Sequence, residues 1–348
     1  MNEPGPPRLK IIYILGSTQS GSTILDMAIG TATSAVSTGE LGHIFWAFEA
    51  AREGSSSVTV PNCSCGLLVT QCPLWSVIWA EMAARGNLRE FEEENRRFET
   101  TALSVPTAVA ARLAHSRAFA RHLDELGSML RSVARNASAG IIVDSTKDPG
   151  RGWLYSLLPT QEFDVRFIHM VRDGRSVLSS MMVTSQPDRF DSAPSPWPPP
   201  AAALFSTLHW IYMNLHASIL GRANRDRYLR IRYEDLVGHP VETLESIEAF
   251  AEIDLSESRK RVTAGKPLSS GHLLCGNRSK TTPTLKVQAS GRSRSSLSRG
   301  PELIFLLLAG WLQWYYMRPS VPKGPTGLRT QKARRNLTSS HFEGEKRS

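Results

Sequence analysis

The segment Lys10-Ile-Ile-Tyr-Ile-Leu-Gly16-Ser-Thr-Gln-Ser-Gly21-Ser-Thr-Ile-Leu25 decides the fold class of this chain. Its apolar run, Ile11 to Leu15, predicts a buried strand, and a turn bounded by two glycines follows. The residues from Thr23 to Gly30 then predict the first turns of a helix. A strand, a glycine-bounded loop and a helix N-terminus together favour a bound anion, because backbone N–H groups and the positive end of the helix point at it.

The spacing within the loop is close to that of a nucleoside-triphosphate site, G-x-x-x-x-G-K-[ST]. Gly16 and Gly21 have the required separation, and Thr23 stands at the Ser/Thr position. Ser22 stands where the lysine would be. Because that lysine reaches the outer phosphates of a triphosphate, its absence predicts a nucleotide with less charge at its 5′ end. A plain Gly/Ser turn between strand and helix is the alternative interpretation.

The length allows one large domain or two small ones, and the basic surplus suits anionic ligands, nucleic acid or acidic membrane surfaces. The chain has 348 residues, of which 41% are hydrophobic, and its net charge is +9. We expect residues 1–9 to be disordered, residues 10–318 to form the domain, and residues 319–348 to be a disordered basic tail. We expect no nucleic-acid partner, because no basic helix is interleaved with stacking aromatic residues.

Neither end of the chain predicts a membrane segment. Residues Met1 to Arg8 are proline-rich and lack the apolar core of a signal peptide. The apolar segment Leu303 to Trp311 is shorter than the roughly 20 residues that span a bilayer, and it predicts a buried helix. We therefore expect a cytoplasmic location.

Three further apolar runs predict strands, which lie at residues 141–147, 165–171 and 228–233. Helical patterns separate them, so the sequence predicts a single α/β domain with a P-loop-like central parallel sheet flanked by helices. Helices are predicted at residues 23–30, 45–51, within 74–135, and at 152–158, 204–222, 240–251 and 302–317. The proline-rich residues 186–200 predict a loop without regular structure, and the basic residues 269–299 predict either a flap over the ligand or a loose loop.

Three of the four cysteines lie close together, at Cys63, Cys65 and Cys72. Three thiolates and one further ligand could hold a zinc ion, but no fourth ligand is evident nearby. A local disulfide and a tight, partly buried turn are the alternatives. On balance the sequence predicts no metal site.

Three segments resemble the sulfotransferases that use 3′-phosphoadenosine 5′-phosphosulfate. The loop Gly16-Ser-Thr-Gln-Ser-Gly-Ser-Thr-Ile-Leu25 resembles their 5′-phosphosulfate loop, and Phe167-Ile-His-Met-Val-Arg172-Asp-Gly-Arg-Ser-Val-Leu-Ser-Ser180 resembles their 3′-phosphate segment. Arg232-Tyr-Glu-Asp-Leu-Val237 resembles the strand end beside their adenine pocket. The segments Val143-Asp-Ser-Thr-Lys-Asp148 and His272-Leu-Leu-Cys-Gly-Asn-Arg278 are typical of bacterial members.

This resemblance implies the donor, the site and the chemistry. The donor would be 3′-phosphoadenosine 5′-phosphosulfate, with no metal, and the acceptor would be a hydroxyl or amine of a small molecule, glycan or peptide. The Gly-Glu pair of the tyrosylprotein branch points to Glu40 as the base that removes the acceptor proton. His43 is the alternative base because its ordinary pKa suits that task, and Lys147, at the end of an apolar strand, could add a cation at the leaving group. The donor-binding residues would be Gln19, Ser20, Gly21, Ser22, Thr23, Arg172, Ser180, Tyr233, Arg292 and Arg294.

One position departs from the family pattern. Gln19 stands where the family usually carries lysine or arginine, so the loop lacks a cation beside the transferring group. Lys147, Arg292 or Arg294 could compensate. The alternatives are a P-loop kinase, which the serine at position 22 disfavours, and a catalytically weak nucleotide-binding relative.

Overall fold

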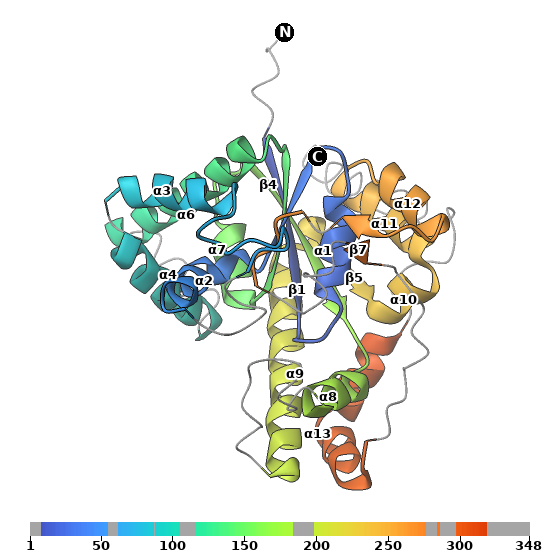
Figure 1. Cartoon of the computed structure of the whole chain (residues 1–348). Helices are drawn as coiled ribbons and strands as arrows, with labels where there is room; N and C mark the ends of the chain where they lie inside the picture. Colours follow the sequence, from blue (N-terminus) through green and yellow to red (C-terminus); the bar gives the residue numbers. More distant parts are fainter. Residues whose placement is uncertain are drawn as a thin grey trace, which may run out of the picture.

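The computed structural model describes residues 8–54, 62–86, 88–104, 116–183, 198–269, 271–275, 284–285 and 297–318. A five-stranded parallel sheet with the order β2-β3-β1-β4-β5 forms its centre (Figure 1). The strands are β1 (Leu9–Gly16), β2 (Ala35–Gly39), β3 (Ile141–Lys147), β4 (Phe163–Val171) and β5 (Tyr228–Arg232). The α/β fold with a central parallel sheet is therefore confirmed.

Alternate residues of β1 build the two layers on either side of the sheet. Ile11, Tyr13 and Leu15 pack into one buried cluster, and Ile12 and Ile14 pack into another. This alternation follows from the two-residue period of a strand, and both faces are apolar because helices cover both. Its pairing with β3 on one edge and β4 on the other makes β1 the central strand.

Helices from the first half of the chain cover the face of the sheet to which Ile11 and Tyr13 point. Helix α1 and three later helices cover the opposite face (Figure 1). The first group is α2 (Ile44–Arg52), α3 (Trp75–Ala84), α4 (Leu88–Ser104), α6 (Arg117–Asn136) and α7 (Pro149–Ser156). The second group is α1 (Ser22–Gly30), α10 (Tyr233–Gly238), α11 (Pro240–Ala251) and α12 (Ser256–Thr263). Two short 3₁₀ helices, Leu41–His43 and Arg225–Arg227, join neighbouring elements.

Three helices form a lobe that extends from the end of the sheet: α8 (Gly174–Val183), α9 (Pro199–Ala223) and α13 (Arg299–Met317) (Figure 1). Trp210, Phe305 and Tyr316 lie in its small core. The prediction of a buried helix here is wrong for one side of α13, where Leu307 is 73% exposed and Trp311 64% exposed. Packing against α8 and α9 buries only one stripe of an apolar helix.

The structure corrects two further predictions. Strand β2 was missed, because its sequence Ala-Val-Ser-Thr-Gly is short and half polar; pairing with β3 makes it a strand. Pro199 and Pro200 were predicted to lie in a loop, but they begin α9. Proline is tolerated there, since the first turn of a helix needs no N–H donors.

A small antiparallel pair, β6 (Leu268–Ser269) and β7 (Thr284–Leu285), begins one residue before the predicted flap and ends within it. Arg292 and Arg294 lie outside the described residues. Among the helices that the structure describes, none combines the length and apolarity needed to cross a bilayer. The cytoplasmic location stays a prediction.

Candidate active site

The register of the sheet brings the polar strand ends to one edge. Leu15 of β1 pairs with Lys147 of β3, and Gly16 pairs with Met170 of β4. Val171 in turn pairs with Arg232 of β5. The loop after β1 therefore lies between Lys147 on one side and the residues after β4 on the other. Open parallel sheets bind their ligands at this carboxyl edge, where the order of the strands reverses on either side of the first strand.

The loop from Gly16 to Gly21 needs glycine at both ends. Gly21 has φ of +92°, and a Cβ built there would lie 2.4 Å from Cδ2 of Tyr233. Gly16 is equally constrained, since its Cβ would lie 2.5 Å from the carbonyl oxygen of Met170. Gln19 also has a left-handed backbone, with φ of +63°. These constraints shape a turn that exposes backbone N–H groups to a ligand.

Two serine hydroxyls in this loop suit an oxyanion. The Oγ atoms of Ser17 and Ser20 are buried and, among the described residues, have no hydrogen-bond partner. Ser22 and Thr23 begin α1, where the first N–H groups of a helix lack partners within the helix. A group that supplies acceptor oxygens would satisfy these donors, since buried polar groups are nearly always hydrogen-bonded.

Arg172 follows β4 directly and contacts the loop. Its Nη1 donates to the carbonyl oxygen of Gln19 at 2.7 Å, and its guanidinium lies 4.6 Å from the centre of the Tyr233 ring. A guanidinium has five N–H donors, so these contacts leave it able to bind an oxyanion. Tyr233, predicted to end a strand, instead begins α10. Ser180 lies on α8, where its hydroxyl donates to the carbonyl of Ser176 at 2.8 Å. The predicted contact of Ser180 with the nucleotide ligand stays a prediction.

The structure joins the three predicted catalytic residues in one cluster. The Nζ atom of Lys147 donates to Oε1 of Glu40 in an ion pair, and Nδ1 of His43 lies 3.0 Å from Oε2 of the same carboxylate. Burial raises the pKa of Glu40, but the charge of Lys147 and the hydrogen bond from His43 outweigh it and lower that pKa to about 2. Glu40 is therefore ionised, and Lys147 holds it.

The end of β3, Asp-Ser-Thr-Lys, positions this cluster through hydrogen bonds of its side chains. Oδ1 of Asp144 accepts the backbone N–H of Thr146 at 2.9 Å, and Oγ1 of Thr146 accepts the N–H of Gly42 at 2.9 Å. Lys147 itself has φ of +74°, an uncommon conformation for a residue other than glycine. Such strain occurs where the surrounding contacts fix the backbone, often at functional sites.

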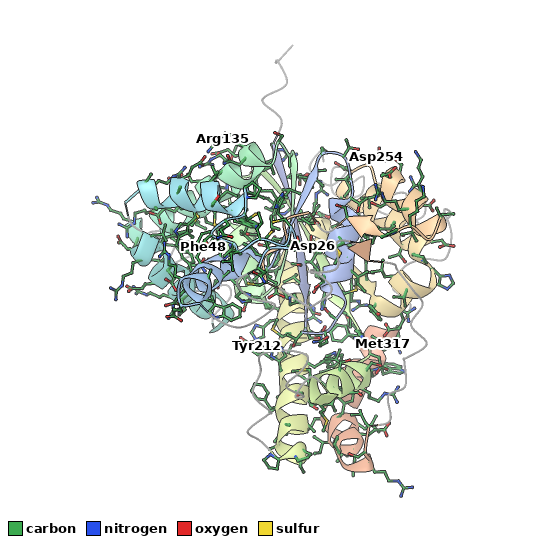
Figure 2. All side chains as sticks on the ribbon, viewed as in Figure 1. Asp26, Phe48, Arg135, Tyr212, Asp254 and Met317 are labelled. Atoms are coloured by element: carbon green, nitrogen blue, oxygen red, sulfur yellow. The ribbon has the colours of Figure 1, made fainter. Side chains whose placement is uncertain are left out.

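Asp26 is another buried carboxyl group, which the sequence analysis did not single out. Its Oδ2 accepts the hydroxyl of Ser145 at 2.6 Å and the N–H of Gly39 at 3.2 Å, so it ties α1 to the ends of β3 and β2. Figure 2 places it in the centre of the molecule beside the sheet. Burial raises its pKa to about 7, although the Ser145 hydrogen bond acts in the opposite sense. The sequence did carry a signal for this residue, because an aspartate is unexpected in the apolar stretch of a predicted helix.

His209 of α9 is another residue that sequence reasoning missed. Its Nε2 lies 3.2 Å from Oγ1 of Thr18, at the outer side of the loop. It stands in a helix that has no sequence motif, so only the packing of α9 against the loop reveals it.

One comparison with known proteins identifies a family for most of this chain. Residues 12–257 match the sulfotransferase family, and a search of curated proteins found no match. Among solved structures, the sulfotransferase domain of the Synechococcus PCC 7002 olefin synthase is similar, with 20% identity, a TM-score of 0.49, and coverage of 91% of this chain and 98% of that domain.

Two further structures are similar. The sulfotransferase domain from the curacin biosynthetic pathway has 17% identity and a TM-score of 0.44, over 91% of this chain and 100% of that one. Sulfotransferase STF1 from Mycobacterium tuberculosis H37Rv has 12% identity and a TM-score of 0.43, over 86% of this chain and 77% of that one. Since the family match covers most of the chain, including the loop, Glu40, Lys147 and Arg172, this protein belongs to the sulfotransferase family and is a transferase.

Proposed function

We propose that the chain transfers a sulfuryl group from 3′-phosphoadenosine 5′-phosphosulfate to a hydroxyl or amine, with the loop from Gly16 to Thr23 holding the 5′ end of the donor. Family membership implies this donor. The observation that carries the residue assignment is the register, which sets Leu15 beside Lys147 and Gly16 beside the end of β4. A basic group, an acid and an anion loop thereby share one edge of the sheet.

The donor fits the residues present in the loop. The buried hydroxyls of Ser17 and Ser20 need acceptor oxygens, and a phosphosulfate supplies them. Ser22 in place of the P-loop lysine suits a group with less charge than a triphosphate. This difference, together with the family match, favours sulfuryl transfer over the kinase alternative.

Arg172 would bind the 3′-phosphate of the donor. It lies beside the loop and stacks over Tyr233, so both residues would lie near the nucleoside. A guanidinium forms paired hydrogen bonds to phosphate oxygens, which a lysine cannot. Ser180, two helical turns along α8, would add a hydroxyl donor to the same phosphate. Contributions from Arg292 and Arg294 stay predictions.

Glu40 would accept the proton of the acceptor group, and Lys147 controls when it can do so. With a pKa of about 2, the carboxylate is a weak base while the ion pair is intact. The anionic end of a bound donor attracts the Nζ atom of Lys147 away from Glu40. The burial of Glu40 is then offset only by His43, so the pKa of Glu40 rises toward the range of a useful base.

The bound donor supplies the sulfuryl group, whose transfer forms a bond from the acceptor oxygen or nitrogen to sulfur and breaks the bridging sulfur–oxygen bond. Glu40 receives the acceptor proton, and Lys147 with the N-terminus of α1 stabilises the charge on the leaving phosphate oxygen. We propose that no metal takes part, because these groups already supply positive charge. The acceptor is a small molecule, glycan or peptide.

The test separates donor binding from chemistry. Thermal shifts with adenosine 3′,5′-bisphosphate, compared with ATP plus magnesium, measure which nucleotide the loop binds. Turnover of radiolabelled donor over an acceptor library then measures transfer. Glu40→Gln should keep nucleotide binding and lose roughly 10²–10⁴ in turnover, whereas Glu49→Gln, on the exposed side of α2, should match the parent.

Two results would contradict this assignment. A stronger shift with ATP plus magnesium than with the bisphosphate would exclude the proposed donor site. If Glu40→Gln keeps its turnover and His43→Ala abolishes it, the base is His43.

A further inference from the structure

Three cysteines and one histidine converge in a cluster outside the proposed active site. Nδ1 of His272 lies 3.3 Å from Sγ of Cys72 and 3.7 Å from Sγ of Cys63. Together with Sγ of Cys65, the four atoms all lie within 4.8 Å of one another. All three cysteines are free thiols, two of them buried and Cys65 exposed. The fourth ligand that the sequence did not reveal is thus present, about 200 residues along the chain.

The spacing of these atoms suits a tetrahedral zinc ion. With Zn–S bonds of about 2.3 Å and Zn–N bonds of about 2.0–2.1 Å, a tetrahedron separates sulfur from nitrogen by about 3.5 Å and sulfur from sulfur by about 3.8 Å. The two sulfur–nitrogen distances bracket the first value. A Cys₃His set is typical of closed structural zinc sites.

The local backbone holds the ligands in this arrangement. The N–H of Cys63 donates to the carbonyl of Leu67 at 2.8 Å, and the N–H of Gly66 donates back to Cys63 at 3.0 Å. Gly66 has φ of +90°, which lets the chain turn tightly between the first two cysteines and Leu67. Cys72 lies just before α3.

The histidine segment is fastened to the cysteine segment by hydrogen bonds independent of any metal. Ser64 Oγ donates to the carbonyl of Gly271 at 2.8 Å and accepts the N–H of Leu273 at 2.7 Å. Nε1 of Trp75 donates to the carbonyl of His272 at 2.8 Å. The four ligands are therefore brought together before a metal arrives, so little ordering entropy opposes its binding.

We propose that Cys63, Cys65, Cys72 and His272 bind one Zn²⁺ ion in a closed structural site. All four positions of the tetrahedron are filled by protein ligands, so no position remains for a reacting water or substrate. A disulfide between two of the cysteines would leave only the third thiol and His272 as metal ligands. This proposal replaces the prediction from sequence that the chain has no metal site. The zinc ion would stabilise the structure, and the transfer reaction itself is proposed to need no metal.

The proposed zinc site would also hold the backbone beside Glu40. The N–H of Leu274 donates to the carbonyl of Thr38 at 2.8 Å, and the N–H of Glu40 donates to the carbonyl of Leu274 at 3.0 Å. Gly39 lies so close to this segment that a Cβ there would approach the Leu274 oxygen to 2.4 Å. Zinc bound by His272 anchors the segment that flanks the end of β2. An effect of zinc on turnover would depend on the proposed function of Glu40. The zinc content of the chain does not depend on that function.

The test measures metal directly on the full chain, expressed with zinc sulfate and purified without chelators. Elemental analysis should find one zinc per chain. Exchange for Co²⁺ should give visible d–d bands and a sulfur-to-cobalt charge-transfer band, as expected for tetrahedral thiolate ligation. Cys65→Ser and His272→Ala should lose zinc during dialysis against a chelator that the parent withstands. Cys275→Ser, which changes a buried thiol outside the cluster, should keep it.

Cys65 is the most informative position, because its exposed side chain can change without disturbing the core. Substoichiometric metal in the parent, or equal zinc retention by the parent, Cys65→Ser and His272→Ala, would overturn the proposal. A disulfide between two of the three cysteines, found by mass spectrometry of freshly lysed cells, would overturn it as well. If zinc is bound but no transferase activity is found with any acceptor, the zinc site stands and the proposed function fails.

Discussion

The ion pair between Glu40 and Lys147 makes a quantitative prediction about stability. The side chains of Glu40 and Lys147 are 15% and 9% exposed, so solvent screens the pair little. The pKa of Glu40 falls from 4.5 to about 2 in the folded chain, a difference that corresponds to about 3 kcal/mol of folding free energy. Removing Lys147 leaves a buried carboxylate without its partner, which typically costs about 3–5 kcal/mol.

The assay is a double-mutant cycle measured by urea unfolding at pH 7. It uses the parent, Glu40→Gln, Lys147→Met and the double variant, and we expect a coupling energy of about 2–3 kcal/mol, since His43 shares part of the stabilisation. A control cycle on Arg89 and Glu93, an ion pair on α4 with side chains 92% and 66% exposed, should show almost no coupling.

The pH dependence of this coupling follows from the direction of the pKa change. A carboxyl group whose folded pKa is depressed contributes its stability above the unfolded value and loses it as the pH falls through the folded value. The contribution of Glu40 should therefore decline by about 0.8 kcal/mol by pH 4 and by about 2 kcal/mol by pH 3. A coupling energy at pH 7 no larger than that of the Arg89–Glu93 control would refute the proposed ion pair.

Four further predictions concern single residues. Arg172→Ala removes a charge-assisted contact worth about 1.5–3 kcal/mol, so calorimetry should show affinity for adenosine 3′,5′-bisphosphate reduced roughly 10- to 150-fold; unchanged affinity would exclude Arg172 from the donor site. Gly21→Ala places a Cβ against Tyr233 at φ of +92° and should lower the free energy of unfolding in urea by at least about 1–2 kcal/mol, and a neutral effect would contradict the close packing. Asp26 has a raised pKa of about 7, so its charge opposes folding as the pH rises from about 4 to 7; Asp26→Asn should gain stability relative to the parent over that range, and a constant difference would argue against this carboxyl. Gln19→Arg should raise turnover tenfold for each 1.4 kcal/mol of transition-state stabilisation, and a decrease in initial-rate assays would mean that another cation already lies beside the leaving group.

The central part of this fold follows from local sequence patterns. The alternating apolar residues of β1, the glycines at positions 16 and 21 and the following helix are all specified within about 20 residues, and the structure agrees. Arg172 could be predicted to lie beside the loop because it directly follows an apolar run, and the carboxyl ends of parallel strands share one edge. Such features depend on periodicity and on the conformations that glycine permits, so they can be inferred from sequence.

Other features depend on contacts between residues far apart in the chain. The segment before Glu40 became a strand only through its pairing with β3 and Leu274. The ion pair of Glu40 with Lys147 joins residues 107 positions apart, and His272 meets Cys72 across 200. Local conformational preference carries no information about which distant groups will meet. The sequence alone therefore determined four of the five strands of the sheet, the loop and most of the candidate residues. Tertiary packing decided the remaining strand, which carboxylate is paired, which cysteines have a fourth ligand and which apolar helix stays exposed.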